Sequence, residues 1–298
     1  MRDESVDFGR GSVNDQHSSW RVKWGGRLAA FAGRMRSLGG PLSSLSAMCA
    51  EAMAVGLMRR ADVEELVTQT YHSRPEFYDP NRYELPYEQR MLPTLQKLRP
   101  SGHLLDAFCG QGREAKLFAQ ADYQVTAVDQ LDWMIEAAKQ YAMLEGFEAD
   151  FQVDDFDQMV VSRPFDVVYT SCWMYSTVQS RKRRQAFLSQ CYRLCDREGI
   201  IVLSHLGRSG DSTLGTRSRY LVAKLTAILT LGNFGTEIGE RLYTGLFWHH
   251  LDDATVDQEI RDAGLRVIDR IPGTGMEPTF LFLAPRSVEV EEAEIEAR

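Results

Sequence analysis

An aspartate and two glycines lie where a strand would end and a helix would begin. An apolar run from His103 leads to Asp106, then Gly110 and Gly112 follow, and a helical pattern starts at Arg113. Glycine suits such a turn because it accepts positive φ angles and lets the main chain approach a ligand closely. The N–H groups at the start of the next helix then face that ligand. The residues therefore predict a ligand site at a strand–turn–helix junction.

A dinucleotide is the first ligand to consider for this junction. The run from Gly110 to Ala115 fits the fingerprint G-x-G-x-x-G/A, and Asp129 follows at the distance of a ribose-binding acid. An NAD-dependent oxidoreductase is therefore one interpretation. A dinucleotide fold, however, places its first glycine directly at the end of the strand, whereas here Asp106 comes four positions before Gly110.

A second family fits the acids better. The pattern Asp-x-x-x-Gly-x-Gly from Asp106 to Gly112, with a second acid ending the next strand at Asp129, resembles the class I S-adenosylmethionine-dependent methyltransferases. The resemblance implies that Asp106 holds the amino end of the methionine moiety, indirectly or through water. It implies that Asp129 binds both ribose hydroxyls. The chemistry agrees, because an ammonium group pairs with a carboxylate and a diol needs a bidentate acceptor.

The resemblance also assigns residues around the adenine. Met134, in the helix after Asp129, is expected to pack beside the ring. Asp155 is expected to accept a hydrogen bond from the adenine amino group, with Asp154 as the alternative, while Phe156 stacks on the ring. The other interpretation of these three residues is a solvated acidic turn.

A tyrosine before the first strand can reach the cofactor's carboxylate in this family. Tyr71 and Tyr78 are the two candidates. The other residues expected to line the cofactor are Ala107, Phe108, Cys109, Gln130, Thr170 and Ser171.

Alternating segments predict an α/β architecture. Strands are expected over residues 103–106, 125–129, 149–153, 165–169 and 199–205, and a strand pair over 265–271 and 279–284. The resemblance implies a Rossmann-like, doubly wound mixed sheet of seven strands, six parallel and one antiparallel, which is the class I methyltransferase fold. The final antiparallel pair argues against a dinucleotide dehydrogenase.

The composition and length of the remaining segments predict how the chain is organised. Residues 1–40 are rich in Gly, Ser and Arg and are expected to be flexible. Residues 41–100 form a predicted N-terminal helical extension, and residues 101–286 the cofactor-binding domain. Residues 206–245 are long for a connection and predict an inserted lid over the substrate, and residues 287–298 form an acidic tail.

Three histidines are candidates for a general base. His205 ends the fifth strand, and His249 and His250 precede a later helix. Histidine titrates near neutral pH and could take a proton from an acceptor hydroxyl or amine. The alternative is that each is a hydrogen-bonded wall residue, and many members of such families need no base.

The acceptor is predicted only by class. After the fourth strand the chain has Thr170-Ser171-Cys172-Trp173, without the Asn/Asp-Pro-Pro motif of enzymes that methylate nucleic-acid amino groups or glutamine amides. The net charge of −8 also argues against a nucleic-acid surface. A small molecule or peptide is therefore the favoured acceptor. The alternatives are a protein methyltransferase and a non-catalytic scaffold that keeps the fold.

The composition argues against disulfide-rich, metal-binding and membrane-spanning proteins. The chain has 298 residues and five cysteines, none in a C-x-x-C pair, so neither a disulfide framework nor a metal site is expected. These features indicate a reducing, cytoplasmic location. No apolar run is long enough to span a bilayer. The oligomeric state is not predicted.

Overall fold

A computed structural model describes residues 19–73, 80, 86–208, 213–243 and 245–286. The chain divides into two compact units. The first, here called the helical unit, comprises residues up to Ser73 together with Leu221–Phe234 and Leu242–Phe247. The second, called the sheet unit, comprises Arg74–Tyr220, Gly235–Arg241 and Trp248 to the end.

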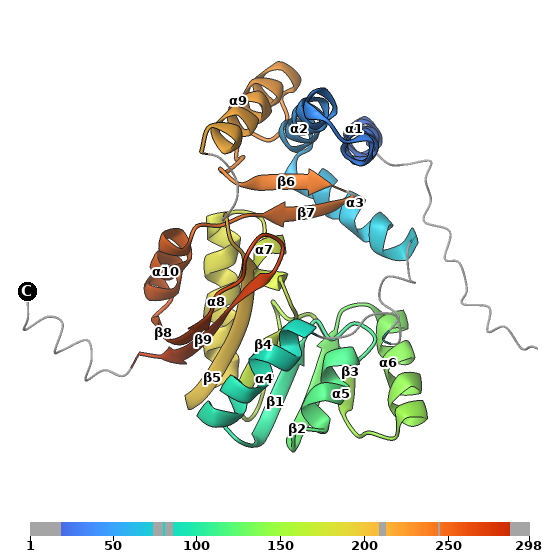
Figure 1. The fold of residues 1–298 in the computed structure, drawn as a ribbon. Coiled ribbons are helices and arrows are strands. Elements are labelled where there is room, and N and C mark those ends of the chain that lie inside the picture. Colours follow the sequence, from blue (N-terminus) through green and yellow to red (C-terminus); the bar gives the residue numbers. More distant parts are fainter. Residues whose placement is uncertain (1–18, 74–79, 81–85, 209–212, 244, 287–298) are drawn as a thin grey trace, which may run out of the picture. The chain divides into compact units, whose positions relative to one another are not determined.

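The sheet unit is built on a seven-stranded sheet with the order β3-β2-β1-β4-β5-β9-β8 (Figure 1). β1, β2, β3, β4 and β5 are mutually parallel, and β9 runs antiparallel to both β5 and β8. Six strands thus share one direction, as predicted. The strands are β1 (Gly102–Ala107), β2 (Tyr123–Asp129), β3 (Asp150–Val153), β4 (Phe165–Thr170), β5 (Cys195–Leu206), β8 (Leu265–Ile271) and β9 (Pro278–Pro285).

Helices cover both faces of this sheet because the strands are apolar on both sides. Val168 of β4 belongs to the core on one face, and its neighbours Val167 and Tyr169 belong to the core on the other. The first face packs against α7 (Met174–Thr177), α8 (Arg181–Leu194) and α10 (Asp253–Asp262). The second face packs against α4 (Pro86–Leu98), α5 (Arg113–Ala119) and α6 (Asp132–Glu145).

The helical unit contains α1 (Trp20–Leu38), α2 (Pro41–Leu57), α3 (Arg60–Ser73) and the second half of α9 (Thr213–Thr230). These helices pack closely. A Cβ added at Gly56 of α2 would lie 2.1 Å from the carbonyl oxygen of Ala223 in α9. A second, two-stranded sheet pairs β6 (Glu240–Tyr243) with β7 (Leu246–His249).

The prediction of a flexible segment over residues 1–40 was wrong for the part that forms α1. Gly25 and its neighbouring glycine lower the helical propensity of this segment. Packing overrides that propensity, since a Cβ at Gly25 would lie 1.9 Å from the sulfur of Met58. The glycine therefore permits a close approach of helices. Residues 1–18 and the predicted acidic tail lie outside the described residues.

The unit boundaries also differ from the predicted domains. The expected helical extension over residues 41–100 is divided, because its last helix, α4, belongs to the sheet unit. Part of the expected lid, Leu221–Phe234, joins the N-terminal helices in one compact unit. Segments separated by more than a hundred residues thus share a core, which periodicity cannot reveal.

No single helix in the described ranges is long and apolar enough to cross a membrane. The pair α2 and α3, bent by 117° at their junction, passes a test of length and composition only when taken together.

Candidate functional site

The site is built on the loop between β1 and α5. Phe108, Gly110 and Gly112 adopt φ angles of 63°, 52° and 84°, all in the left-handed region. A Cβ at Gly112 would lie 3.1 Å from Ala138 and Phe151, so this glycine serves close packing. A Cβ at Gly110 would meet no atom within 4 Å of the described chain. Gly110 is therefore the position where the main chain faces open space.

Asp106, at the carboxyl end of β1, is fully buried. Neither of its carboxylate oxygens has a hydrogen-bond partner within the described part of the chain. Burial raises the pKa of Asp106 well above its ordinary value, and the charges of Glu114 and Asp129 raise it further. A buried carboxylate without partners is costly, so this geometry is suited to a cationic ligand.

Asp129 ties the loop to the end of β2. Its carboxylate accepts hydrogen bonds from the N–H groups of Gly110 (3.1 Å) and Leu131 (3.0 Å). Burial is the main cause of a raised pKa at Asp129, which these N–H donors oppose. A carboxylate has about four acceptor positions, so acceptor capacity remains for a ligand's hydroxyl groups.

Three functional candidates were missed in the sequence. Glu88 of α4 is buried, and burial with repulsion from Glu114 raises its pKa to about 7. Arg113 forms an ion pair with Glu114 at 3.1 Å. Both glutamates and Asp129 act on Asp106 as neighbouring negative charges. A signal existed for Glu88, because it shares the buried face of α4 with residues three and seven positions later.

The loops after β1 and β4 are hydrogen-bonded to each other. The N–H of Ser171 donates to the carbonyl of Ala107 at 3.1 Å. The N–H of Cys109 donates to the carbonyl of Val128 at 3.0 Å, and burial raises the pKa of the Cys109 thiol, which is thus unreactive. Thr170 is buried, and its hydroxyl has no partner among the residues that the structure describes.

The residues expected to surround the adenine, and Gln130 near them, differ in their position relative to the site. The N–H of Asp154 donates to the carbonyl of Asp129 at 3.1 Å, so Asp154 lies at the edge of the site. Asp155 is exposed and closes a turn by accepting from the N–H of Asp157 at 3.1 Å and from a glutamine amide. The solvated-turn interpretation therefore holds for Asp155. Met134 is buried near the start of α6, and Gln130, just before that helix, is half-buried.

The stacking role predicted for Phe156 does not fit the structure. Its ring is 3% exposed and lies 5.0 Å from the ring of Phe108 and 5.2 Å from that of Phe187. It belongs to the core between the sheet and α8. An aromatic residue in this position stabilises the loop through packing.

The histidines do not fit the role of base. Residues alternate along β5, so Leu203 and His205 face α10, whereas Val202 faces the side of Asp106. His205 is fully buried, its Nε2 lies 3.6 Å from a carboxylate oxygen of Asp253, and burial lowers its pKa. It therefore lies across the sheet from Asp106.

The other two histidines are wall residues. Nδ1 of His249 accepts from Arg184 (3.0 Å) and Nε2–H donates to the carbonyl of Ile238 (3.0 Å). Burial and the charge of Arg184 lower the pKa of His249 to about 3. His250 is also buried, with Nδ1 3.3 Å from the carbonyl of Gly207. The hydrogen-bonded interpretation is thus the one that fits.

The tyrosine prediction is not tested. Tyr71 is half-buried in α3 of the helical unit. Tyr78 lies outside the described residues.

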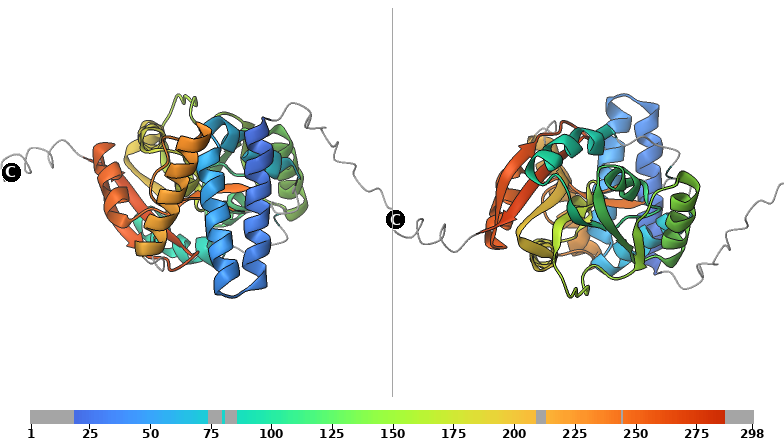
Figure 2. Two further views of the ribbon diagram at one scale, coloured as in Figure 1. Left: turned by 90° about the horizontal axis from the view of Figure 1, so that it is seen from above. Right: turned by 90° about the horizontal axis from the view of Figure 1, so that it is seen from below.

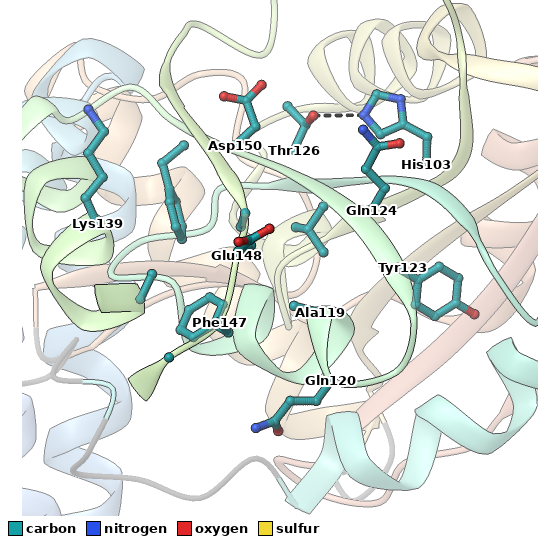
Figure 3. A pocket seen from close by; sticks show the side chains of 15 residues that line it. His103, Ala119, Gln120, Tyr123, Gln124, Thr126, Lys139, Phe147, Glu148 and Asp150 are labelled. Carbon is teal, nitrogen blue, oxygen red and sulfur yellow. Dashed lines mark hydrogen bonds between the residues drawn. The ribbon is translucent and has the colours of Figure 1, made fainter. Parts of the chain in front are cut away.

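An open groove of about 1080 Å³ lies elsewhere on the sheet unit (Figure 3). Its walls come from the amino ends of β1 and β2 and from the loop before β3, including His103, Gln124 and Phe147. A hydrogen bond of 2.9 Å joins His103 to Thr126 in this wall. Ligands of open α/β sheets bind at the carboxyl ends of the strands, so this groove is not the candidate site.

A family model described as a methyltransferase domain matches residues 104–199, from β1 into β5. The chain contains a methyltransferase domain and has the class I methyltransferase fold. This match covers the β1 loop, both strand-end aspartates and the segment after β4. No match was found among curated proteins.

Three solved structures share the fold, and two of them are named as methyltransferases. An S-adenosylmethionine-dependent methyltransferase from Clostridium acetobutylicum is 11% identical, with a TM-score of 0.52 over 73% of this chain and 99% of that one. The 1,6-didemethyltoxoflavin-N1-methyltransferase of Burkholderia thailandensis is 14% identical, with a TM-score of 0.54 over 76% and 87%. The PH0226 protein of Pyrococcus horikoshii is 18% identical, with a TM-score of 0.52 over 73% and 99%.

The residues present fit S-adenosylmethionine, the cofactor expected of a methyltransferase with this fold. Its ammonium group would supply a cationic partner for the carboxylate of Asp106. The remaining acceptor capacity of Asp129 suits a ribose diol, and the main chain at Gly110, which donates to Asp129, is not crowded by other atoms. The dinucleotide interpretation explains neither the buried Asp106 nor the antiparallel β9.

Proposed function

We propose that this enzyme transfers a methyl group from S-adenosylmethionine to a small-molecule acceptor, a short peptide being included in that class. The observation that supports the proposal is the buried carboxylate of Asp106, which has no partner within the described residues and ends the strand that leads into the uncrowded loop at Gly110. The cofactor supplies an electrophilic methyl group on a sulfonium. The protein has to bind the cofactor, orient the acceptor and, for a hydroxyl or amine, receive a proton.

Within the site, each residue has a proposed role. Asp106 pairs with the ammonium group of the cofactor, and Asp129 accepts its ribose hydroxyls. Asp154 is better placed than Asp155 for the adenine amino group, because its main chain is hydrogen-bonded to the end of β2. Met134 remains the residue proposed to pack beside the adenine.

An aromatic cluster favours a planar or apolar acceptor. The rings of Tyr87 and Trp248 lie edge-on to Trp173, at 5.7 and 6.2 Å. Trp173 follows β4 and has a φ of 64°, and its main-chain N–H donates to the hydroxyl of Ser204 at 2.7 Å. Its indole N–H is buried with no acceptor in the described ranges, so it can orient a polar atom of the substrate. The Burkholderia enzyme named above likewise acts on a small molecule, didemethyltoxoflavin.

Glu88 replaces the histidines as the proposed proton acceptor. It lies on the same side of the sheet as Asp106, and its pKa of about 7 is close to neutral pH. Its carboxyl interacts with the thiol of Cys172, which in turn interacts with Ser204, the residue bonded to Trp173. This chain of groups leads from Glu88 toward the aromatic cluster. The cytoplasm is the proposed location, because all five cysteines are free.

A labelling experiment tests the acceptor class. The full chain is incubated with S-adenosylmethionine carrying a labelled methyl group and with cell extract divided by filtration into small molecules and proteins. Label in the small-molecule fraction is expected. Label confined to the protein fraction would favour a protein methyltransferase. Binding of cofactor without label in either fraction would favour the scaffold.

A further inference from the structure

Helix α1 carries an apolar stripe on the side that faces solvent. Trp20, Trp24, Phe31 and Leu38 are 53%, 53%, 45% and 71% exposed. Their spacing of four, seven and seven residues places all four side chains on one side of a helix. The residues that pack into the helical unit lie on the opposite side, namely Val22, Gly25, Ala29 and Ala32. The stripe is therefore additional to the face that α1 needs for folding.

Helix α9 repeats this arrangement. Leu221, Leu225 and Ile228 recur at spacings of four and three, and they are 60%, 61% and 60% exposed. Leu229 beside them is 84% exposed, whereas Ala227 on the other side is fully buried. Two helices of one unit thus each show an apolar stripe outside the core.

Helix α2 lies between α1 and α9 in the helical unit and packs closely against α9 (Figure 2). A guanidinium nitrogen of Arg21 donates to the carbonyl of Thr230 at 2.7 Å, which joins the start of α1 to the end of α9. Two further exposed side chains follow α9, Leu231 at 63% and Phe234 at 57%. The exposed apolar side chains therefore gather on one packed unit.

Charge distinguishes these helices from the rest of the chain. α1 contains five basic residues and no acid, and α9 contains three basic residues and no acid, in a protein of net charge −8. The guanidinium of Arg21 lies 4.6 Å from the ring centre of Trp20, and that of Arg27 lies 5.2 Å from that of Trp24. Positive charge and exposed indole rings are thus interleaved on the same surface.

We propose that this surface, formed by the stripes of α1 and α9, binds the face of an anionic phospholipid bilayer. Tryptophan prefers the headgroup level of a membrane, where its ring is apolar and its edge is polar. Basic residues beside it are attracted to phosphate groups, and a helix with this composition lies in the interface. The absence of acids from both helices matches an anionic partner. The helices lie along the surface and do not span it.

Vesicle flotation tests the proposal with the full chain. Wild-type protein is expected to float with vesicles that contain roughly one third phosphatidylglycerol in phosphatidylcholine, and to bind phosphatidylcholine alone weakly. High salt should reduce the binding. The double variant Trp24→Ser with Leu225→Ser should lose about tenfold in vesicle affinity, because both side chains are exposed and available for insertion.

The matched control carries the same kind of change on another surface. Met143 and Leu144 of α6 are 77% and 79% exposed, and Met143→Ser with Leu144→Ser should float like wild type. Circular dichroism confirms that each variant is folded. Wild-type protein that binds neither vesicle, or equal binding by the two double variants, would overturn the proposal. So would self-association that the Trp24 and Leu225 changes abolish while vesicles stay unbound, because a second copy would then occupy the surface.

Discussion

Asp129 is the residue whose role can be tested most simply. Replacing it with alanine removes the acceptor of the ribose hydroxyls and two hydrogen bonds within the loop. Asp129→Ala should therefore lower the affinity for S-adenosylhomocysteine by roughly ten- to a hundredfold, the range for hydrogen bonds to a charged group. Fluorescence titration measures the affinity. Asp132→Ala, at an exposed acid three residues later, is the control, and equal effects of both changes would reject the role.

Glu88 makes stability depend on pH. Its folded pKa of about 7 lies above the unfolded value of 4.5, so its protonated form favours folding. The contribution is fully present below pH 4.5 and is lost as the pH rises through 7, by about 3 kcal/mol at most.

Glu88→Gln removes that loss. Relative to wild type, the variant should gain unfolding free energy when the pH is raised from 5 to 8, as measured by urea denaturation. Glu136→Gln, at a glutamate 67% exposed on α6, should show no such gain. A Glu88→Gln effect that is the same at both pH values would contradict the assignment.

The positions of site residues could be predicted from the sequence where their spacing within a local unit decides where they lie. Asp106, Gly110 and Asp129 lie at fixed distances within one strand–turn–helix–strand unit, so their positions follow from local structure. Glu88 and Phe156 required tertiary contacts. Glu88 approaches Asp106 only because α4 packs on the sheet, and the core that buries Phe156 comes partly from α8.

At the scale of elements, α8 and α10 are joined by a buried ion pair. Arg184 is 1% exposed and donates to both carboxylate oxygens of Glu259, at 2.8 and 2.9 Å. The hydroxyl of Tyr175 donates to the same carboxylate at 2.5 Å. The network fixes α10 against the sheet, and it explains why His249 is not available as a base.

Arg184→Met should leave the charge of Glu259 buried without its partner. We expect a loss of about 3 to 5 kcal/mol of unfolding free energy, measured with urea. Arg181→Met breaks the exposed pair with Asp262 instead and should cost much less unfolding free energy. Similar losses for the two variants would show that the buried pair does not hold these helices together.

Strands and helices could be predicted from the sequence where their apolar residues form a regular or continuous pattern. The central strands are continuous apolar runs, and their limits were found within a few residues. Helix α1 was not predicted, because Gly25, Gly26 and Gly33 interrupt its sequence and its stability comes from α2, beyond the reach of a local pattern. A local pattern likewise did not reveal that Leu221–Phe234 of the predicted lid shares a unit with the N-terminal helices. The function of the lid remains a prediction.

At the scale of the whole molecule, the two units have separate cores. Val22 and Ala29 of α1 are buried against α2, α3 and α9 in the helical unit. Deleting residues 1–40 should therefore expose that core and lower the melting temperature of the helical unit, while the sheet unit keeps its own transition. Differential scanning calorimetry measures both transitions. A melt identical to that of the full chain would show that α1 contributes nothing to the unit.

The central claim is that the site at the ends of β1 and β2 binds S-adenosylmethionine. Isothermal titration of the purified full chain with S-adenosylhomocysteine, with NAD as the comparison ligand, tests it most directly. We expect micromolar binding of S-adenosylhomocysteine and no binding of NAD. Binding of NAD alone would restore the oxidoreductase interpretation, and binding of neither ligand would contradict the account in favour of a non-catalytic scaffold.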